Sequence, residues 1–165
     1  SLILPRAWVE RFIVWSDPPD AAMVIASLHH RGAKVKLLGS PAYTISVGLK
    51  LAKDAANGIT GITDWAVTDE PAVQDWAKKM EARAKLPANF IHSVYYDGMN
   101  ILAQTIDKVG TDPAALRDGL KSMKGYKGIT GEYTFDQNGD GLRQAYIVQV
   151  KNGAPVMVKS VKADQ

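Results

Sequence analysis

The sequence contains no cysteine among its 165 residues, which excludes disulfides, thiol nucleophiles and thiolate-bound metals. It also has no stretch near the roughly 18 consecutive apolar residues of a membrane-spanning helix. Basic residues outnumber acidic ones by only 20 to 17, and no run of Lys or Arg exceeds two residues. A charge this weak and this evenly spread does not predict a nucleic-acid partner. With 46% hydrophobic and 22% charged residues, the composition is that of about one globular domain.

A secretory signal is also missing from the start of the sequence. The apolar residues Ser1–Leu4 end at Pro5, and Arg6 follows, whereas a signal peptide has a basic start and then about 7–15 apolar residues. The residues alone therefore leave two compartments open: the chain stays in the cytoplasm, or it begins after its signal. Residues 1–12 match no recognised pattern and are kept apart as an unassigned start.

The common catalytic and nucleotide-binding motifs are absent too. No glycine-rich dinucleotide loop, phosphate-binding loop or nucleophile elbow occurs. The carboxylates that could serve acid–base chemistry stand at expected helix starts or strand ends, where helix capping accounts for them. They are Asp17, Asp64, Asp69 and Glu70. The sequence therefore predicts no catalytic residue and no cofactor, and a protein that is not an enzyme.

Metal binding is not predicted either. His29 and His30 are adjacent, so they point to different faces of a helix, and no other ligand residue lies at a suitable spacing. Residues 136–141 begin like a calcium-binding loop, but Ile147 stands where that loop requires a chelating Glu. A polar turn is the better interpretation of this segment.

Three short apolar runs alternate with helix-forming segments in the first part of the chain. Strands are expected at residues 12–15, 34–38 and 59–63, with helices between them. Asp17 is the predicted N-cap of the first helix, and Gly32 is expected to close it. This β-α-β-α-β order predicts an α/β fold with a parallel sheet.

Ligands of such sheets bind at the carboxyl ends of the strands. The loops at residues 16–19 and 40–43 are therefore the first candidates for a binding site, and residues 64–68 are the next. Beside these loops and the later connector stand the aromatic residues Tyr43 and Phe90, for which a ligand-facing role competes with core packing. His92 is a further binding-site candidate, against the alternative of a solvated surface residue.

Three amphipathic helices follow, beginning near residues 71, 90 and 113, and strand and turn residues dominate after Gly125. The inner face of the second helix is expected to carry Val94, Gly98, Ile101, Leu102, Thr105, Ile106 and Val109. Three helices in succession leave too little sheet for them to cover. The order of elements thus indicates that part of the fold lies outside this sequence, on its N-terminal side.

Several segments resemble type I periplasmic solute-binding proteins, and more specifically the leucine/isoleucine/valine-binding proteins of ABC importers. They occur in the family's order, over about residues 13–158, at 13–22 (IVWSDPPDAA), 31–40 (RGAKVKLLGS), 52–59 (AKDAANGI), 96–98 (YDG), 110–117 (GTDPAALR), 128–140 (GITGEYTFDQNGD) and 146–153 (YIVQVKNG). The resemblance implies solute binding for import by closure of two lobes around an amino acid or similar solute.

By this resemblance the chain corresponds to the C-terminal half of a two-lobed protein. Residues 13–86 are then a parallel-sheet, Rossmann-like part of the second lobe, residues 87–141 the hinge connector and first-lobe helices, and residues 142–165 the returning strands and tail. The implied partners are a small-molecule ligand, an ABC permease, and the missing N-terminal half or a second copy of the chain. The implied location is the periplasm or extracellular face.

The resemblance also implies ligand contacts in the two loops and the connector, and the aromatic residues beside the strand ends add Trp15 and Tyr43. The predicted ligand site consists of Trp15, Ser16, Asp17, Pro18, Ser40, Pro41, Tyr43, Phe90 and His92. The branched-chain type often has an aromatic residue at the first loop and an acidic one at the second, where Pro18 and Pro41 stand here. The expected ligand is therefore an amino acid of the branched-chain type or a related carboxylic or aromatic acid.

Two alternatives remain from the sequence. One is a flavodoxin-like enzyme or signalling domain, although residues 16–19 supply neither an acidic cluster nor a phosphate-binding loop. The other is the ligand-binding module of a receptor.

Overall fold

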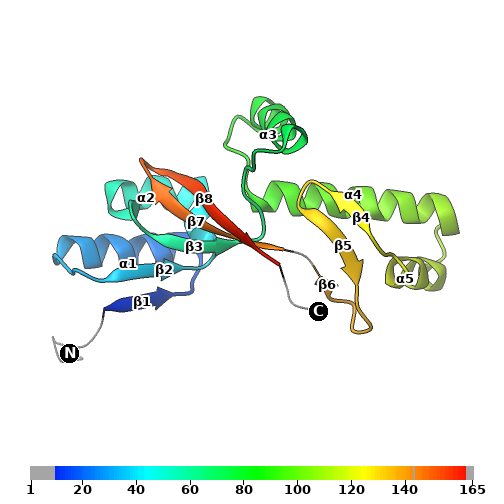
Figure 1. The fold of residues 1–165 in the computed structure, drawn as a ribbon, viewed down its shortest axis with the longest axis horizontal. Helices are drawn as coiled ribbons and strands as arrows, with labels where there is room; N and C mark the ends of the chain where they lie inside the picture. Colours follow the sequence, from blue (N-terminus) through cyan, green and yellow to red (C-terminus); the bar gives the residue numbers. More distant parts are fainter. Residues whose placement is uncertain (1–9, 143, 163–165) are drawn as a thin grey trace. The chain divides into compact units, whose positions relative to one another are not determined.

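The computed structural model describes residues 10–142 and 144–162 of the chain (Figure 1). It divides into two compact units, which are treated separately below. Unit 1 comprises Ser1–Thr63 and Ile147–Val158, and unit 2 comprises Asp64–Tyr146 and Lys159–Gln165. The lobe boundaries predicted at residues 12, 86 and 141 refer to a whole two-lobed protein and stay a prediction.

Unit 1 is built on a five-stranded sheet with the strand order β1-β2-β3-β7-β8. The strands are β1 (Arg11–Val14), β2 (Lys36–Gly39), β3 (Thr60–Thr63), β7 (Ala145–Lys151) and β8 (Ala154–Val161). β1 and β2 are parallel, with Ile13 opposite Leu38, and β2 and β3 are parallel, with Leu38 opposite Thr60. The predicted α/β fold with a parallel sheet is confirmed.

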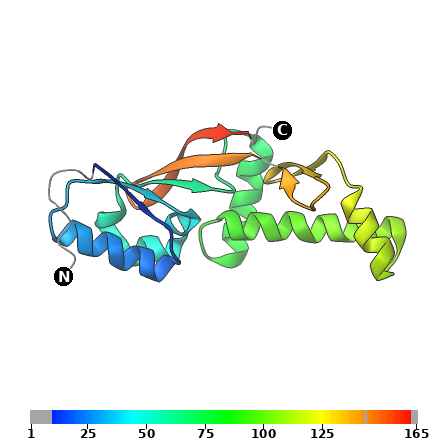
Figure 2. The same cartoon turned by 90° about the horizontal axis from the view of Figure 1, so that it is seen from below.

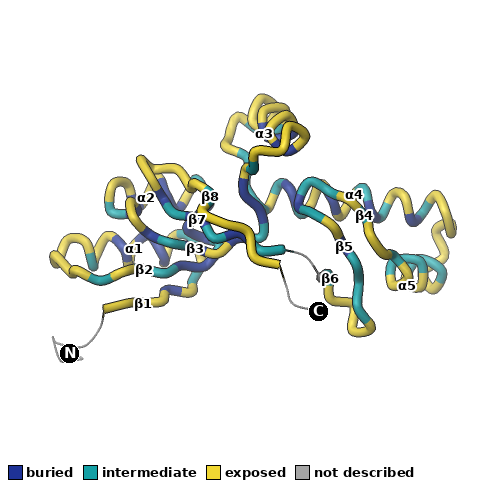
Figure 3. Tube along the Cα trace, in the orientation of Figure 1, coloured by how far each residue is buried: buried dark blue, intermediate teal, exposed yellow. Residues whose placement is uncertain are grey.

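Helices α1 (Pro18–His30) and α2 (Ser46–Ala52) lie on one side of this sheet (Figure 2). Two short 3-10 helices, η1 (Pro41–Thr44) and η2 (Lys53–Ala56), connect α2 to β2 and β3. The core between helices and sheet is apolar and consists of Val14, Ala21, Ala22, Ile25, Ala42, Tyr43, Leu49, Ala52, Ala56, Ile59 and Val150. Along α1 buried and exposed residues alternate (Figure 3). Ala21 and Ile25 are buried as the apolar periodicity predicts, whereas Val24, which the same periodicity places on the inner face, is exposed.

The ends of α1 follow from local sequence signals. Asp17 is the N-cap, but its side chain accepts no capping hydrogen bond, and Pro19 has no N–H to offer at the second helical position. At the other end Gly32 has φ +65°, and Gly32 N–H and Ala33 N–H donate to the carbonyls of His29 and Leu28. This is a Schellman motif, so the predicted role of Gly32 is confirmed.

Unit 2 contains three helices and a three-stranded sheet. The helices are α3 (Pro71–Ala84), α4 (Phe90–Val109) and α5 (Pro113–Lys121), and the antiparallel strands are β4 (Tyr126–Gly128), β5 (Gly131–Phe135) and β6 (Gly141–Leu142). The three predicted helices are confirmed. Among the described residues no helix is both long enough and apolar enough to cross a bilayer.

An aromatic cluster packs α3 against the start of unit 2. Trp65, Val73, Trp76 and Ala77 are buried together. The rings of Trp65 and Trp76 meet edge to face with centroids 5.4 Å apart, and Tyr96 of α4 lies 5.5 Å from Trp76. Aromatic pairs in such arrangements contribute about 0.5–1.5 kcal/mol beyond the area that they bury.

The inner face predicted for α4 is confirmed in part. Ile101 and Thr105 are buried as expected, while Gly98 and Val109 are exposed. The helix also buries Ser93 and Asp97, which the prediction did not include. The structure buries Asp97 because its carboxylate bonds to the β4–β5 turn, which brings this side of α4 against the small sheet.

Candidate ligand-binding site

The carboxyl ends of β1 and β2 lie side by side because the two strands are parallel neighbours. Trp15, Ser16 and Asp17 follow β1, and Pro18 begins α1. Ser40 follows β2, and Pro41 and Tyr43 belong to η1. Unit 1 thus gathers seven of the nine predicted ligand residues at the carboxyl ends of its strands β1 and β2.

Hydrogen bonds hold the two loops together. The Ser40 hydroxyl donates to the Ser16 carbonyl over 3.1 Å, and the Ser40 N–H donates to the Val14 carbonyl over 3.2 Å. Tyr43 N–H in turn donates to the Ser40 carbonyl over 3.2 Å, which closes the first turn of η1. Ser40 therefore positions the backbone of both candidate loops at once.

Tyr43 is packed beneath these loops, with only 4% of its surface exposed. Its ring lies over Gly39, where a Cβ would come within 1.9 Å of the ring. Glycine is required at position 39 because no side chain fits under the ring. Burial raises the pKa of Tyr43 to about 12, and the neighbouring Ser16 hydroxyl offsets a smaller part of this rise.

The hydroxyls of Ser16 and Tyr43 are both buried, and neither makes a hydrogen bond of normal geometry with any residue that the structure describes. The Ser16 hydroxyl is near enough to lower the pKa of Tyr43, so the two hydroxyls lie next to each other. An unsatisfied buried hydroxyl costs about 1–3 kcal/mol. Two such hydroxyls beside the ends of β1 and β2 favour a functional role for this place over a purely structural one.

The exposed rim of the site is aromatic and acidic. Trp15 is 70% exposed, and the Asp17 side chain is also exposed. Pro18 and Pro19 occupy the first two positions of α1 and have no N–H, so this helix end offers fewer donors to an anion than most. The rim can stack on an apolar or aromatic group and attract a cationic one.

Phe90 and His92, the other two predicted ligand residues, lie at the start of α4 in unit 2. Phe90 is half-buried and packs against the Trp65–Trp76 cluster. His92 Nδ1 accepts a 3.3 Å hydrogen bond from Asn89 N–H, as part of a capping box. Both side chains therefore have structural contacts, and their role in ligand binding stays a prediction.

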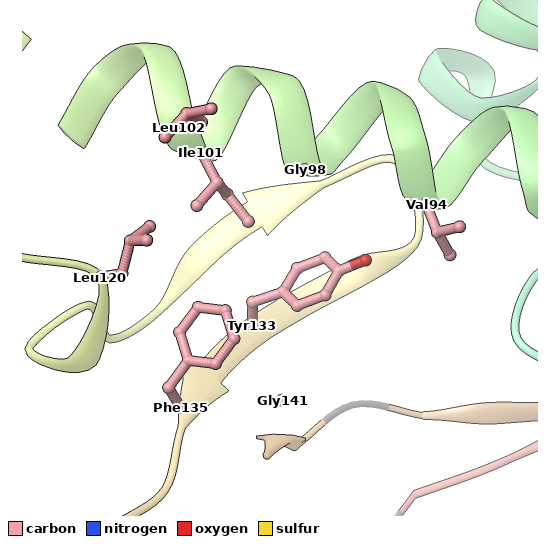
Figure 4. Close-up of a pocket in the computed structure, with 8 residues that line it drawn as sticks. All are labelled: Val94, Gly98, Ile101, Leu102, Leu120, Tyr133, Phe135 and Gly141. Carbon is pink, nitrogen blue, oxygen red and sulfur yellow. The ribbon is translucent and has the colours of Figure 1, made fainter. Parts of the chain in front are cut away.

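An apolar groove of about 490 Å³ lies in unit 2 (Figure 4). It is lined by Val94, Gly98, Ile101, Leu102, Leu120, Tyr133, Phe135 and Gly141. Ile101 of α4 extends toward the rings of Tyr133 and Phe135, and the Tyr133 hydroxyl is engaged with Thr130. No charged side chain lines the groove, so it lacks the polar contacts that fix the orientation of a small polar ligand.

The segment that begins like a calcium loop forms a turn between β5 and β6. Asp136 Oδ1 accepts hydrogen bonds from Asn138 N–H and Asp140 N–H over 2.8 Å and 2.9 Å, and Gly139 has φ +90°. The predicted polar turn is confirmed. Within residues 10–142 and 144–162 there is no group of three or more His, Asp or Glu side chains that could hold a metal.

Sequence reasoning did not identify Asp97 as a key residue. Asp97 is fully buried, and its carboxylate accepts from Ile129 N–H, Thr130 N–H and the Thr130 hydroxyl over 2.9, 2.8 and 2.6 Å. A Cβ at Gly128 would lie 2.4 Å from this carboxylate. The available signal was an acidic residue among the apolar positions of a long helix, together with a small-residue turn at 128–131.

A parallel α/β sheet that carries its candidate ligand residues at the strand ends is typical of small-molecule-binding domains. The profile of the family described as periplasmic binding protein matches residues 8–155, so the chain belongs to this family. No curated protein matches the chain by sequence. The family is one of solute-binding proteins, which favours binding over the flavodoxin-like enzyme alternative.

Three solved structures of solute-binding proteins are similar to the chain. The leucine-binding protein LivK of Thermotoga maritima is 16% identical with a TM-score of 0.84, and the match covers 93% of this chain and 45% of that one. LivJ of Streptococcus pneumoniae in complex with isoleucine is 17% identical with a TM-score of 0.83, and the match covers 93% of this chain and 45% of that one. An ABC transporter solute-binding protein of R. palustris in complex with benzoate is 18% identical with a TM-score of 0.80, and the match covers 94% of this chain and 45% of that one. The chain thus has the fold of a type I periplasmic binding protein and spans about 45% of the length of these relatives.

Proposed function

We propose that the chain is part of the solute-binding component of an ABC importer, and that the carboxyl edge of β1 and β2 forms one wall of its ligand site. The observation that carries this proposal is the joining of the two candidate loops by Ser40, which holds Ser16 and Tyr43 next to each other. Membership of the periplasmic binding protein family supports it. The ligand would bind between two lobes that close on it.

The ligand that suits this wall is a branched-chain amino acid or a related carboxylic or aromatic acid. Trp15 offers an apolar surface at the rim, Asp17 can attract an ammonium group, and the Ser16 and Tyr43 hydroxyls are donors near the loops. The related structures contain isoleucine in one case and benzoate in another, which are the two chemistries to compare first.

The partners of this function would be an ABC permease and the polypeptide that completes the two-lobed fold. The expected location is the periplasmic or extracellular face of the membrane. Family membership and the similarity to transport proteins support both expectations. No catalytic step is part of the proposal.

The proposal is tested by titrating leucine, isoleucine and benzoate into the natural gene product by calorimetry. We expect one of these classes to bind, and Trp15→Ala to weaken its affinity about 10-fold, since a buried aromatic contact contributes roughly 1–2 kcal/mol. Met23→Ala is the matched control because Met23 is 65% exposed on α1, outside the candidate loops. Equal affinities of the two variants would remove Trp15 from the site, and no binding of any compound would count against the proposed function.

A further inference from the structure

Three asparagines of the chain are each followed directly by a glycine, at positions 57–58, 138–139 and 152–153. In such a pair the backbone nitrogen of the glycine can attack the side-chain amide carbon of the asparagine, because glycine has no Cβ to hinder the approach. Asparagine is among the thermolabile residues of proteins. The three pairs offer the same chemistry, so the structure around each of them decides which one reacts.

The pair at 57–58 is held by the sheet of unit 1. Gly58 N–H donates to the Val150 carbonyl over 2.8 Å, and Val150 N–H donates to the Ile59 carbonyl over 2.9 Å. Release of the Gly58 nitrogen therefore requires the start of β3 to separate from β7, and both are inner strands of the five-stranded sheet. Openings inside a sheet are among the most costly local openings of a protein.

The pair at 152–153 forms the turn between β7 and β8. Asn152 has φ +51° and Gly153 has φ +75°, which is the combination that a two-residue hairpin turn of this kind requires. Gly153 N–H donates over 3.0 Å to the side-chain oxygen of Asn57, which lies 96 residues earlier in the chain. The side chain of one pair thus occupies the glycine nitrogen of another.

The pair at 138–139 is held by a bond within its own turn. It lies between β5 and β6 (Figure 1), where residues 137–140 are all exposed. Gly139 N–H donates over 3.1 Å to the carbonyl of Asp136, three residues earlier. A small movement of the turn breaks this bond, because both partners belong to the same exposed segment, and such segments open at little cost in free energy.

We propose that Asn138 is a site of spontaneous deamidation in the folded protein, and that Asn57 protects the pair at 152–153 from the same reaction. The Gly139 nitrogen bonds to Cγ of Asn138 and loses its proton, which passes through solvent to the departing amide nitrogen, so that ammonia leaves and a succinimide ring remains. Water then opens the ring at either carbonyl and gives aspartate or isoaspartate. The product places a third carboxylate in a turn that already carries two.

The test follows all three pairs in one sample. Trypsin separates them into the peptides 54–78, 128–143 and 152–159, each with a single Asn-Gly pair. The 165-residue chain is incubated for several days in warm, mildly alkaline buffer, with and without urea, and mass spectrometry measures the fraction of each peptide in which the amide has become a carboxylate. The sample in urea gives the rates of the unfolded chain.

We expect similar rates at the three pairs in urea, where only the local sequence acts. Without urea, the rate at Asn138 should be at least about 5-fold higher than the rates at Asn57 and Asn152, which is the factor expected from one protecting hydrogen bond to a distant segment. Ion-exchange chromatography gives a second measurement, since each event adds one negative charge to the chain.

Two substitutions of Asn57 test its protective role. Asn57→Ala removes the oxygen that accepts from Gly153 N–H, and it should raise the rate at Asn152 about 5-fold while the rate at Asn138 stays unchanged. Asn57→Asp is the matched control, because it keeps an oxygen acceptor at the same place and should leave the rate at Asn152 close to that of the wild type.

Several results would overturn the proposal, and none of them involves the ligand, so it can fail while the proposed function holds. Equal rates at the three pairs in the folded chain, or a faster reaction at Asn152 than at Asn138, would remove the assignment of Asn138. An unchanged rate at Asn152 in Asn57→Ala would remove the protective role of Asn57. A rise at both Asn138 and Asn152 in that variant would do the same, since it would show general unfolding and no specific protection.

Discussion

At the scale of single residues, Asp97 anchors the turn between β4 and β5 in unit 2. Its carboxylate receives three hydrogen bonds from the turn between β4 and β5, and it is fully buried. Hydrogen bonds to a charged group contribute about 1.5–3 kcal/mol each, and removal of the acceptor leaves two backbone N–H groups buried without a partner. The turn therefore depends on this one side chain.

We predict that Asp97→Ala lowers the free energy of unfolding by about 3 kcal/mol or more, which urea denaturation followed by circular dichroism would measure. Asp107→Ala, an exposed change on the same helix, is the control and should stay within about 0.5 kcal/mol of the wild type. If both variants unfold at the same urea concentration, the carboxylate does not hold the turn.

A second prediction at the residue scale is that the ionisation of Tyr43 lowers the stability of the fold in alkaline solution. Its folded-state pKa of about 12 lies above the ordinary value of 10.0, so the unfolded chain loses the phenolic proton first. Stability is then unaffected below pH 10 and falls between pH 10 and 12, by up to about 1.4 kcal/mol per pH unit from this residue. Tyr43→Phe should be at least as stable as the wild type at pH 8, because it removes a buried hydroxyl without a partner.

The measurement is denaturant unfolding of both proteins at pH 9, 10 and 11. The difference in unfolding free energy between Tyr43→Phe and the wild type should grow from pH 10 to 11, since lysine deprotonation affects both proteins alike. A constant difference across this range would show that Tyr43 ionises equally in the folded and unfolded chain.

At the scale of elements, α1 illustrates how a helix end depends on backbone conformation. Gly32 has φ +65°, and no heavy atom lies within 4 Å of the position that a Cβ would take, so space does not limit the residue there. Gly32→Ala should therefore destabilise the protein by about 1 kcal/mol, through backbone strain alone. Thermal unfolding would measure this, with Ser27→Ala on the exposed side of α1 as the control that stays unchanged or gains stability. A neutral Gly32→Ala variant would mean that the helix end relaxes.

At the scale of the whole molecule, ligand affinity should depend on more than the wall described here. Seven of the nine proposed ligand residues belong to unit 1, and one wall leaves much of a small ligand in contact with water. We predict that the 165-residue chain binds leucine, isoleucine or benzoate at least about 100-fold more weakly than a two-lobed natural product does, as calorimetry would show. Equal affinities would place the complete site within this chain.

Much of the fold could be predicted from the sequence because its signals are local. The prolines at positions 18 and 19, the glycine at position 32 and the apolar periodicity of residues 18–31 define α1 without reference to other elements. The order of strands and helices then predicts the parallel sheet, and the parallel sheet brings the loops after β1 and β2 together. The candidate site followed from the same reasoning together with the family resemblance.

The remaining features depend on contacts between residues far apart in the sequence. The stacking of Tyr43 over Gly39, the link from Ser40 to Ser16, and the anchoring of the β4–β5 turn on Asp97 have no local signature. Apolar periodicity likewise showed that α4 is amphipathic but not which side of it is covered. The sequence by itself determined the elements and their order, because caps, turns and periodicity act within a few residues. Only the tertiary structure decided which buried polar groups find partners and which apolar face stays open, because both depend on the three-dimensional approach of distant segments.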